Sequence, residues 1–186
     1  GVTIDGLTNV EANQLTVTDP AGHGVHIVDA DQIRLAGVTV TDAGGSGAVV
    51  SGSTTVSLTD ATVTGSRAHA VAAETVRGLV LRGATLEGGS AAGGAARSGL
   101  HARNVVPLTV DDVTVAGFEA IPVDIVNGAT FPGVASMPDL PCDTAPCSGT
   151  VQLSTLDISD TPAGAPAVGL RSGQAISSTV RLGGAS

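Results

Sequence analysis

The sequence has neither tryptophan nor tyrosine, and its 186 residues include only two phenylalanines. Globular domains usually fill an irregular core with large aromatic rings, so this chain must build its core in another way. Lysine is also absent, and the formal net charge of −9 argues against nucleic acid as a partner. No apolar run approaches the roughly 20 residues of a membrane-spanning helix, so we expect no membrane span.

The residues that are present are mostly small or β-branched. Hydrophobic residues make up 42% of the chain and 26 residues are glycine, with valine, alanine, leucine and threonine prominent. Such side chains suit thin, repetitive layers of β-strands better than a globular interior. The length fits one domain, which we place over residues 1–186.

The chain repeats itself at a fixed spacing. The stretch LTVTDPAGHGVHI (15–27) is close to VTVTDAGGSGAVV (38–50), which begins 23 residues later. Two apolar pairs recur at this spacing in the first four repeats, and later steps lengthen to 29, 43 and 29 residues. The matching sets are Val10, Ala12, Leu15 and Val17; Ile33, Leu35, Val38 and Val40; Val56, Leu58, Ala61 and Val63; Leu79, Leu81, Ala84 and Leu86; Leu108, Val110, Val113 and Val115; Val151, Leu153, Leu156 and Ile158; and, in part, Val180 and Leu182.

This pattern predicts a parallel β-solenoid. A third apolar pair precedes each set, so each period holds three short strands of alternating character, separated by turns. These pairs are Val2/Ile4, Val25/Ile27, Ala48/Val50, Val71/Ala73, Leu100/Ala102 and Val123/Ile125. A period of three strands describes one coil, and stacked coils pair each strand with its counterpart about 4.8 Å away. We therefore predict an all-β fold.

Outward charges support this register. If it is correct, charges of opposite sign face each other on adjacent coils. The expected pairs are Glu11 with Arg34, Arg82 with Asp111, and Glu74 with Arg103. One position of the first turn also holds residues that tolerate unusual backbone angles, namely Gly6, Asp29, Gly52, Thr75, Asn104 and Asn127.

The chain resembles the right-handed parallel β-helix superfamily of pectate-lyase-like proteins. The stretches that carry the likeness are GVHIVDADQIRLAGVTVTDAGGSG, AVVSGSTTVSLTDATVTGSRAHAV and GLHARNVVPLTVDDVTVAGFEAIPV. The resemblance implies a right-handed parallel β-helix of about seven coils of 23 residues, with three short strands per coil. The superfamily includes polysaccharide lyases, polygalacturonase-type hydrolases, alginate epimerases, phage tailspikes and non-catalytic surface proteins, so the likeness is specific for the fold rather than for an activity.

Members of this superfamily usually close the first coil with a helix. Here the first four residues, GVTI, already alternate like a strand. An open solenoid end exposes apolar columns and unpaired strand edges. We therefore expect the chain to be part of a longer protein or of an assembly, with flanking coils or another subunit covering its ends.

Two departures from the 23-residue period mark longer loops. Insertions at 87–99 and 127–150 flank the first strand of successive coils, and loops on a rigid scaffold often carry function. In proteins of the resembled superfamily, activity lies on the outer face of one sheet, walled by long loops. We therefore expect the working face on the first strands between the two insertions.

Four charged or titratable residues are predicted to meet on that face. The register places Glu74, His101, Arg103 and Asp124 on one outward patch spanning three coils, and Arg97 in the first insertion completes the ligand-binding set. His101 or Arg103 is the candidate base for proton abstraction beside a uronate carboxylate, which an arginine can also neutralise. The alternative is that these charges pair for solubility, and the scarcity of rings on which sugars stack favours it.

The sequence thus predicts a β-helix module of a larger secreted or cell-surface protein, acting as a scaffold or as a surface that binds polysaccharide or another surface ligand. The alternative is a polysaccharide lyase, epimerase or hydrolase acting at the same patch. The sequence requires no cofactor, and Ca²⁺ is compatible with it.

Two cysteines bear on the compartment. Cys142 and Cys147 lie in the Pro-rich stretch PCDTAPC, with no second Cys/His pair to complete a zinc site. We expect a disulfide between them, which implies an oxidising compartment outside the cytoplasm. The alternative is a pair of free thiols in a cytosolic loop.

A histidine pair, a GHG stretch and a grid of threonines are weaker candidates for a functional site. His23 and His69 occupy equivalent positions two coils apart, roughly 10 Å by strand spacing, which is too far to share a metal. The GHG at 22–24 is similar to a polygalacturonase motif, but the acidic residues that accompany the motif are absent. A grid of threonines is similar to the faces of ice-binding proteins, although Glu87 and Ala116 interrupt it. Its members are Thr16, Thr18, Thr39, Thr41, Thr62 and Thr64, with Thr85 and Thr114 extending one column.

Overall fold

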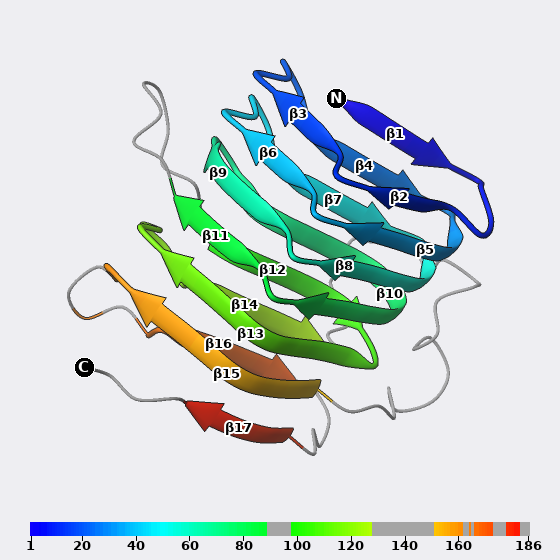
Figure 1. The fold of residues 1–186 in the computed structure, drawn as a ribbon. Coiled ribbons are helices and arrows are strands. Elements are labelled where there is room, and N and C mark those ends of the chain that lie inside the picture. Colours follow the sequence, from blue (N-terminus) through cyan, green and yellow to red (C-terminus); the bar gives the residue numbers. More distant parts are fainter. Residues whose placement is uncertain (89–97, 128–150, 162–163, 165, 173–177, 183–186) are drawn as a thin grey trace, which may run out of the picture.

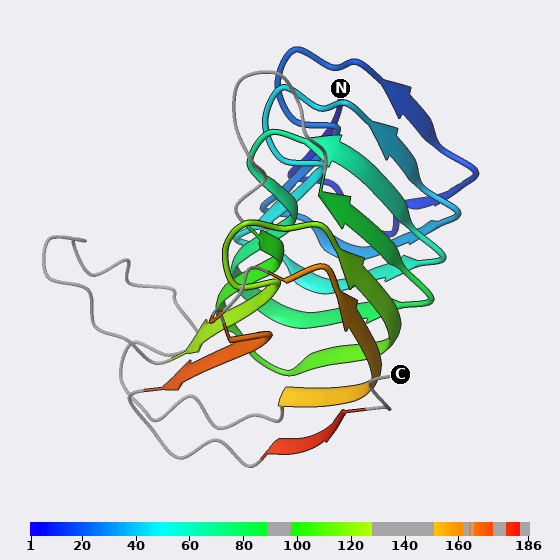
Figure 2. The ribbon, with the colours of Figure 1, turned by 90° about the vertical axis from the view of Figure 1, so that its left-hand side faces the viewer.

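The described part of the chain contains β-strands and no α-helix. The structure is a computed structural model, and it describes residues 1–88, 98–127, 151–161, 164, 166–172 and 178–182. The strands form one continuous 17-stranded sheet that coils upon itself from the blue N-terminal end to the red C-terminal end (Figures 1 and 2). Every pairing between the named strands is parallel.

The first ladder of paired strands carries the candidate site. Each strand pairs with its counterpart one coil along, at a spacing of about 4.8 Å. Its members are β1 (Val2–Asp5), β4 (Val25–Val28), β7 (Ala48–Ser51), the first part of β10 (His69–Arg82), β12 (Ser98–Val105), β14 (Val123–Asn127) and β16 (Val168–Ser172).

Two further ladders complete each coil. The second contains β2 (Glu11–Asn13), β5 (Asp31–Ala36), β8 (Thr54–Thr59), the end of β10, the start of β13 (Leu108–Ala116), β15 (Val151–Ser159) and β17 (Ser178–Leu182). The third contains β3 (Thr16–Thr18), β6 (Thr39–Thr41), β9 (Thr62–Ser66), β11 (Thr85–Gly88) and the later parts of β13 and β15. Three strands per turn of chain are therefore stacked in parallel.

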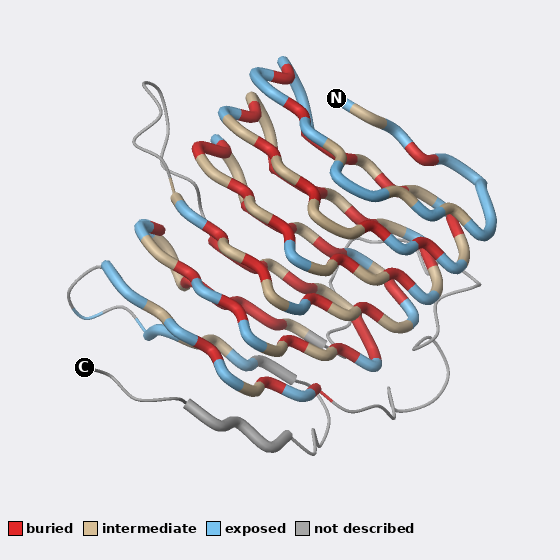
Figure 3. Tube along the Cα trace, viewed as in Figure 1, coloured by how far each residue is buried: buried red, intermediate tan, exposed pale blue. Residues whose placement is uncertain are grey.

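The inward side chains form apolar columns. In β4 and β7 the buried residues alternate with half-buried ones, as the two-residue period of a strand requires. Figure 3 shows buried positions recurring from coil to coil. Burial of each Val, Leu or Ile side chain contributes about 1.5–3 kcal/mol before the entropy cost is subtracted. Small and β-branched residues thus supply a core with almost no aromatic rings, and Phe118 is its one buried ring among the described residues.

Left-handed backbone forms the corners between strands. Five of the six residues at the predicted turn position have positive φ: Gly6 (61°), Asp29 (48°), Gly52 (58°), Thr75 (57°) and Asn104 (51°). The prediction of unusual backbone angles there is confirmed for these five. At a later corner Gly65 also has positive φ (69°), and the Asp42 carboxylate of the preceding coil fills the space where a Cβ would lie. The equivalent residues of the two preceding coils, Asp19 (46°) and Asp42 (52°), also have positive φ, so the corner keeps its left-handed backbone while glycine at position 65 leaves room for the Asp42 carboxylate.

The structure confirms the predicted strand register through β15 and corrects the last step. The sequence pattern placed Val180 beside Val151, 29 residues away, whereas the structure pairs Val180 with Leu153 and Leu182 with Leu156. The strand pairing is irregular between those two partners. Because side chains alternate with a period of two, a two-residue slip leaves the same face inward, so the apolar pattern alone does not detect it.

The coarse fold prediction, an all-β chain of parallel strands, is confirmed. No helix in the described residues is long and apolar enough to cross a membrane. The predicted disulfide between Cys142 and Cys147 lies outside the described residues, as do Arg97 and nearly all of the two insertions.

Candidate functional site

The first ladder brings the four predicted residues together. His101 is the register partner of Asp124, and Glu74 is the partner of Arg103. His101 and Arg103 are two positions apart on β12, so their side chains leave the same face of the sheet. The inward neighbours Leu100 and Ala102 are fully buried. The sequence register is therefore confirmed here, while a role in catalysis or binding stays a prediction.

His101 and Asp124 form the central contact of the site. The His101 Nδ1 lies 3.2 Å from Asp124 Oδ2, and the two side chains are 25% and 10% exposed. At this distance a protonated Nδ1 donates to the carboxylate, which fixes the ring orientation and leaves the Nε2 edge for another partner. The arrangement can therefore present an oriented imidazole on the outer face of β12.

Asp124 is more buried than an outward position suggests. It is one of five buried polar residues described in the structure. On its other side lies Gly169 of β16, whose missing side chain leaves room for Asp124: a Cβ built there would sit 3.2 Å from Asp124 Oδ1 and from Ile121 Cδ1. A carboxylate held in such a confined place is costly unless a cation or donors face it. The proximity of His101 meets that need.

Arg103 and Glu74 form a second, looser pair beside the first. Arg103 Nη1 lies 3.5 Å from Glu74 Oε1, with the side chains 30% and 62% exposed. A pair this exposed contributes at most about 1 kcal/mol to stability. Arg103 lies on β12 and Asp124 on the neighbouring strand β14, so this ion pair and the His101–Asp124 contact share one patch. We call Glu74, His101, Arg103 and Asp124 the charged patch.

His69 also belongs to this region, which the sequence reasoning missed. The His69 ring stacks on His101 with centroids 4.7 Å apart and planes inclined by 13°. His69 lies on β10, where its register partner is Ser98, three residues before His101. The signal was present in the sequence, because the register that aligned His101 with Ala72 also aligns Ser98 with His69.

The other two histidines form a separate pair near the N-terminal end. The rings of His23 and His26 have centroids 5.4 Å apart and are tilted by 54°. The Ser46 backbone N–H donates to His23 Nδ1 at 3.1 Å. Burial, followed by the charge of His26, lowers the pKa of His23 below 6.5. In the ladder the register partners of His26 are the uncharged Thr3 and Val49.

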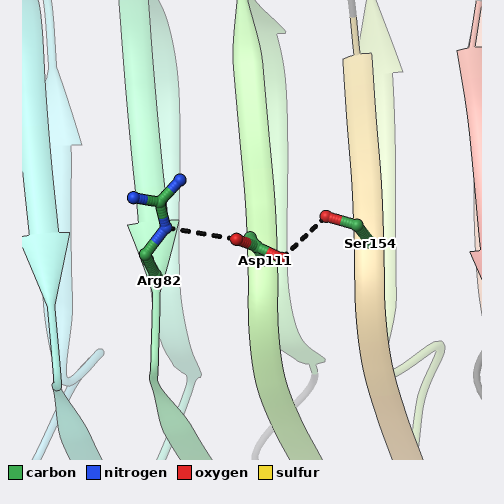
Figure 4. A network of polar contacts seen from close by, with 3 residues as sticks. All are labelled: Arg82, Asp111 and Ser154. Atoms are coloured by element: carbon green, nitrogen blue, oxygen red, sulfur yellow. Dashed lines mark hydrogen bonds and ion pairs between the residues drawn. The ribbon is translucent and has the colours of Figure 1, made fainter.

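Another polar network lies on the second ladder. Arg82 Nε lies 3.2 Å from Asp111 Oδ2, and the Ser154 hydroxyl donates to Asp111 Oδ1 at 2.8 Å (Figure 4). The three residues come from β10, β13 and β15, so the network links three coils in a row. It confirms the predicted Arg82–Asp111 pair. Because the Arg82 side chain is 59% exposed, we interpret this network as a surface contact that stabilises the fold rather than as a binding site.

The threonine grid is present as register predicted. One column runs through the third ladder from β3 to β13 and a shorter one beside it ends after β9, where Glu87 follows Thr64. The first column is Thr16, Thr39, Thr62, Thr85 and Thr114, and the second is Thr18, Thr41 and Thr64. The columns are regularly spaced, and ice binding through them stays a prediction.

The described residues offer no ready metal site. Nowhere in that part of the chain do three or more His, Cys, Asp or Glu side chains stand close enough to hold an ion. The charged patch contains the His101–Asp124 contact, the Arg103–Glu74 ion pair and the stacked imidazoles of His69 and His101, groups that can hold an anion or move a proton.

The ladders and their register define a parallel β-solenoid, in agreement with the family resemblance seen in the sequence. Comparison of the sequence with family models and with curated proteins finds no match.

Two solved structures are similar to this chain. One is the crystal structure of the periplasmic alginate epimerase AlgG, with a TM-score of 0.47 and 11% identity over 94% of this chain and 47% of that chain. The other is a mutant of the same epimerase, with a TM-score of 0.40 and 13% identity over 91% of this chain and 44% of that chain. The chain spans about half the length of the structures it matches.

Proposed function

We propose that this chain is a β-helix module of a larger secreted or cell-surface protein and that it binds polysaccharide through the charged patch. In this proposal the coils form a right-handed helix of about seven coils, a rigid scaffold for an outward surface. The observation that carries the proposal is the placement of the Arg103–Glu74 ion pair and the His101–Asp124 contact side by side on one face, the second built around the buried Asp124.

Position along the chain adds support. In sequence, the predicted insertions at 87–99 and 127–150 stand next to β12 and β14, two of the strands that bear the patch. Insertions in a repeat usually map to the binding face. The proposed location is extracytoplasmic, for which the Cys142–Cys147 disulfide expected from the sequence is the reason.

A pair of matched arginine variants tests this function. Arg103→Ala removes the cation of the patch, whereas Arg82→Ala removes an arginine from an ion pair on the second ladder. Binding of oligogalacturonate and oligoalginate is measured by calorimetry, with circular dichroism as the check of folding. We expect Arg103→Ala to lose binding and Arg82→Ala to bind like the parent chain. Equal behaviour of the two variants would show that the charged patch only stabilises or solubilises the surface.

The second candidate function is enzymatic, a polysaccharide lyase, epimerase or hydrolase. The observation favouring it is the 3.2 Å contact that orients the His101 ring against Asp124. An imidazole held this way accepts a proton at Nε2, and Arg103 can neutralise the carboxylate of a uronate whose adjacent C–H is attacked. Incubation with both oligomers tests it: unsaturated ends report a lyase, inverted sugar configuration an epimerase, and new reducing ends a hydrolase. If the Asp124→Asn variant retained turnover, the contact between His101 and Asp124 would not be part of the mechanism.

Ice binding through the threonine columns is the third candidate. Its support is the unbroken register of five threonines in one column. Thermal hysteresis of the parent chain and of Thr39→Val measures it directly, and the absence of hysteresis in the parent chain would eliminate it.

A further inference from the structure

The first and the last coils carry charges of opposite sign. Residues 1–22 contain three acidic residues and no arginine, whereas residues 161–186 contain two arginines and no acidic residue. The whole chain has a formal net charge of −9, so the basic C-terminal stretch departs from the average composition. The strands of these two stretches lie at opposite ends of the stack of coils, β1 at one end and β17 at the other (Figure 1). The stack is therefore acidic at its start and basic at its end.

The end strands pair on one side only within the described residues. At the start, β1 pairs with β4 and β2 with β5; at the other end, β16 pairs with β14 and β17 with β15. We call β1 and β2 the N-terminal face and β16 and β17 the C-terminal face. An edge that presents N–H and C=O groups is a template for a further strand. None of the four strands contains proline, so each of their residues keeps its N–H donor.

Apolar side chains are uncovered at both ends. In the described part of the chain the exposed large hydrophobic residues are Leu7 of the first coil (51%) and Leu170 of β16 (36%). The register partner of Leu170 is Ile125, which is fully buried. At the other end Val2 is half-buried, although its partner Val25 is fully buried one coil along. The inward columns thus lose their cover where the stack ends, and burial of such side chains favours association.

The register of the first ladder brings opposite charges together when a second copy is stacked on the C-terminal face. One outward column of this ladder is Asp5, Val28, Ser51, Glu74, Arg103, Val126 and Arg171. If β16 is followed by β1 of a second copy, Arg171 takes the register position beside Asp5 of that copy. The same column already contains such a pair, because Arg103 Nη1 lies 3.5 Å from Glu74 Oε1 one coil away. A stacked copy therefore repeats an interaction that the chain makes internally.

The second ladder gives an independent match. Val180 of β17 pairs with Leu153, whose column leads back through the coils to Ala12 of β2. Placing β2 of a second copy after β17 therefore sets Val180 beside Ala12. Arg181, which follows Val180, then stands diagonal to Glu11, which precedes Ala12. Diagonal neighbours on paired strands are about 7–8 Å apart, within reach of long side chains.

We propose that copies of this chain associate head to tail, with the C-terminal face of one copy on the N-terminal face of the next. The contact continues the parallel ladders: the Val2 N–H donates to the Gly24 carbonyl at 2.8 Å, and the same step sets the Val168 N–H of one copy against the Gly1 carbonyl of the next. Contact between two N-terminal faces would instead bring acidic residues together, and like charges across an interface are unfavourable. A head-to-tail contact leaves one face of each kind uncovered, so the assembly grows beyond a dimer. This inference is independent of polysaccharide binding.

The first experiment measures the mass of the 186-residue chain by sedimentation velocity and by light scattering, at concentrations up to about 1 mM. We expect the average mass to rise with concentration through dimers to longer species, because each added copy presents a new face. A chain that stays monomeric over the whole range overturns the proposal. A closed dimer without larger species also overturns it, since that result indicates a symmetric contact.

The second experiment reverses the charges that the proposal brings together. Asp5→Arg sets two arginines against each other and Arg171→Glu sets two carboxylates against each other, so each variant should associate at least about tenfold more weakly. A chain with both substitutions restores the opposite charges and should associate like the parent chain. Glu87→Arg, on β11 in the middle of the stack, changes the net charge as Asp5→Arg does and should leave association unchanged. Circular dichroism checks that each variant is folded.

Mixing the two single variants separates this contact from other modes of association. Asp5→Arg and Arg171→Glu each fail to pair with themselves, but in alternation every contact joins opposite charges, so the mixture should form mixed assemblies. No association in the mixture, or a folded double variant that does not recover, overturns the pairing of Arg171 with Asp5. An equal loss in the Glu87→Arg control shows that net charge rather than the end faces governs association, and it overturns the proposal as well.

Discussion

The two halves of the first ladder share one scaffold and differ in what they present. From β1 to β7 the strands follow at 23-residue steps, and the outward column reads Thr3, His26 and Val49. From β10 to β14, where the insertions interrupt the spacing, the outward positions include the charged patch. The inward residues are apolar in both halves, and apart from the half-buried Val2 those from β1 to β14 are buried. The fold is thus set by the inward columns, and chemistry varies on the outward ones.

The largest expected effect comes from placing a charge in the apolar core against which both halves pack. Leu81 is fully buried between Leu58 and Val110. Leu81→Asp places a carboxylate there without a partner, at a cost of about 4–5 kcal/mol or more. We expect the variant to be unfolded or insoluble, as measured by circular dichroism and by the soluble fraction.

An outward position on the third ladder gives the matched control. Thr62 lies between Thr39 and Thr85 on that ladder and is only half-buried. Thr62→Asp should change the free energy of unfolding by about 0.5 kcal/mol or less. Similar damage from the two aspartates would mean that the inward and outward assignments are wrong.

Two corner glycines, in the part of the chain with 23-residue spacing, test how tightly the turns pack. Gly65 and Gly6 both have left-handed backbone, but the Asp42 carboxylate fills the Cβ position at Gly65, whereas nothing lies within 4 Å of that position at Gly6. Left-handed backbone alone costs an alanine roughly 1–2 kcal/mol. Gly6→Ala should show that cost in a urea titration, and Gly65→Ala should exceed it. Equal costs would contradict the packing of Asp42 against the corner.

The two arginine ion pairs compare a surface contact with the proposed site. Arg82 pairs with Asp111 at 3.2 Å and is 59% exposed. Arg82→Ala should lower the free energy of unfolding by less than about 1 kcal/mol and leave ligand binding intact. A larger loss in a urea titration would show that the Arg82–Asp111–Ser154 network holds the coils together more strongly than its exposure suggests.

The smallest expected effect concerns His23 and His26, which lie in the part of the chain with 23-residue spacing. The pKa of His23 is lowered below 6.5 in the folded chain, first by burial and then by His26. As pH falls below about 6.5, the unfolded chain binds the proton first, so folded-state stability is lost on acidification. His23→Gln should therefore lose less stability than the parent between about pH 7 and pH 5. Urea midpoints at the two pH values measure the difference, and identical losses would contradict the burial of His23.

The fold was predictable because one physical rule repeats. Inward apolar pairs recur with the period of a coil, so aligning Leu15 with Val38 also aligns every later strand until β15. The same alignment correctly paired His101 with Asp124 across the coils. The predicted pairing of β17 was wrong because the strand is shifted by two residues. A two-residue shift keeps the alternation of inward and outward positions, so the apolar pattern does not reveal it.

The site was predictable only in part. Register reports which residues are neighbours but not how far a side chain leans along the strand, so the stacking of His69 on His101 was missed. It also assigns Asp124 to the outer face without showing that the side chain is buried, with Gly169 of the next strand leaving room for its carboxylate. Such burial depends on the neighbours on both sides of Asp124, whereas an alignment compares two positions at a time.

The most direct test of the central claim is a crystal structure of the chain with oligogalacturonate or oligoalginate bound. The account predicts a sugar carboxylate against Arg103, beside His101, on the outer face of β10, β12 and β14. An oligomer bound elsewhere, such as over the threonine columns or the uncharged outward column of β4 and β7, would contradict the claim that the charged half of the first ladder is the binding face.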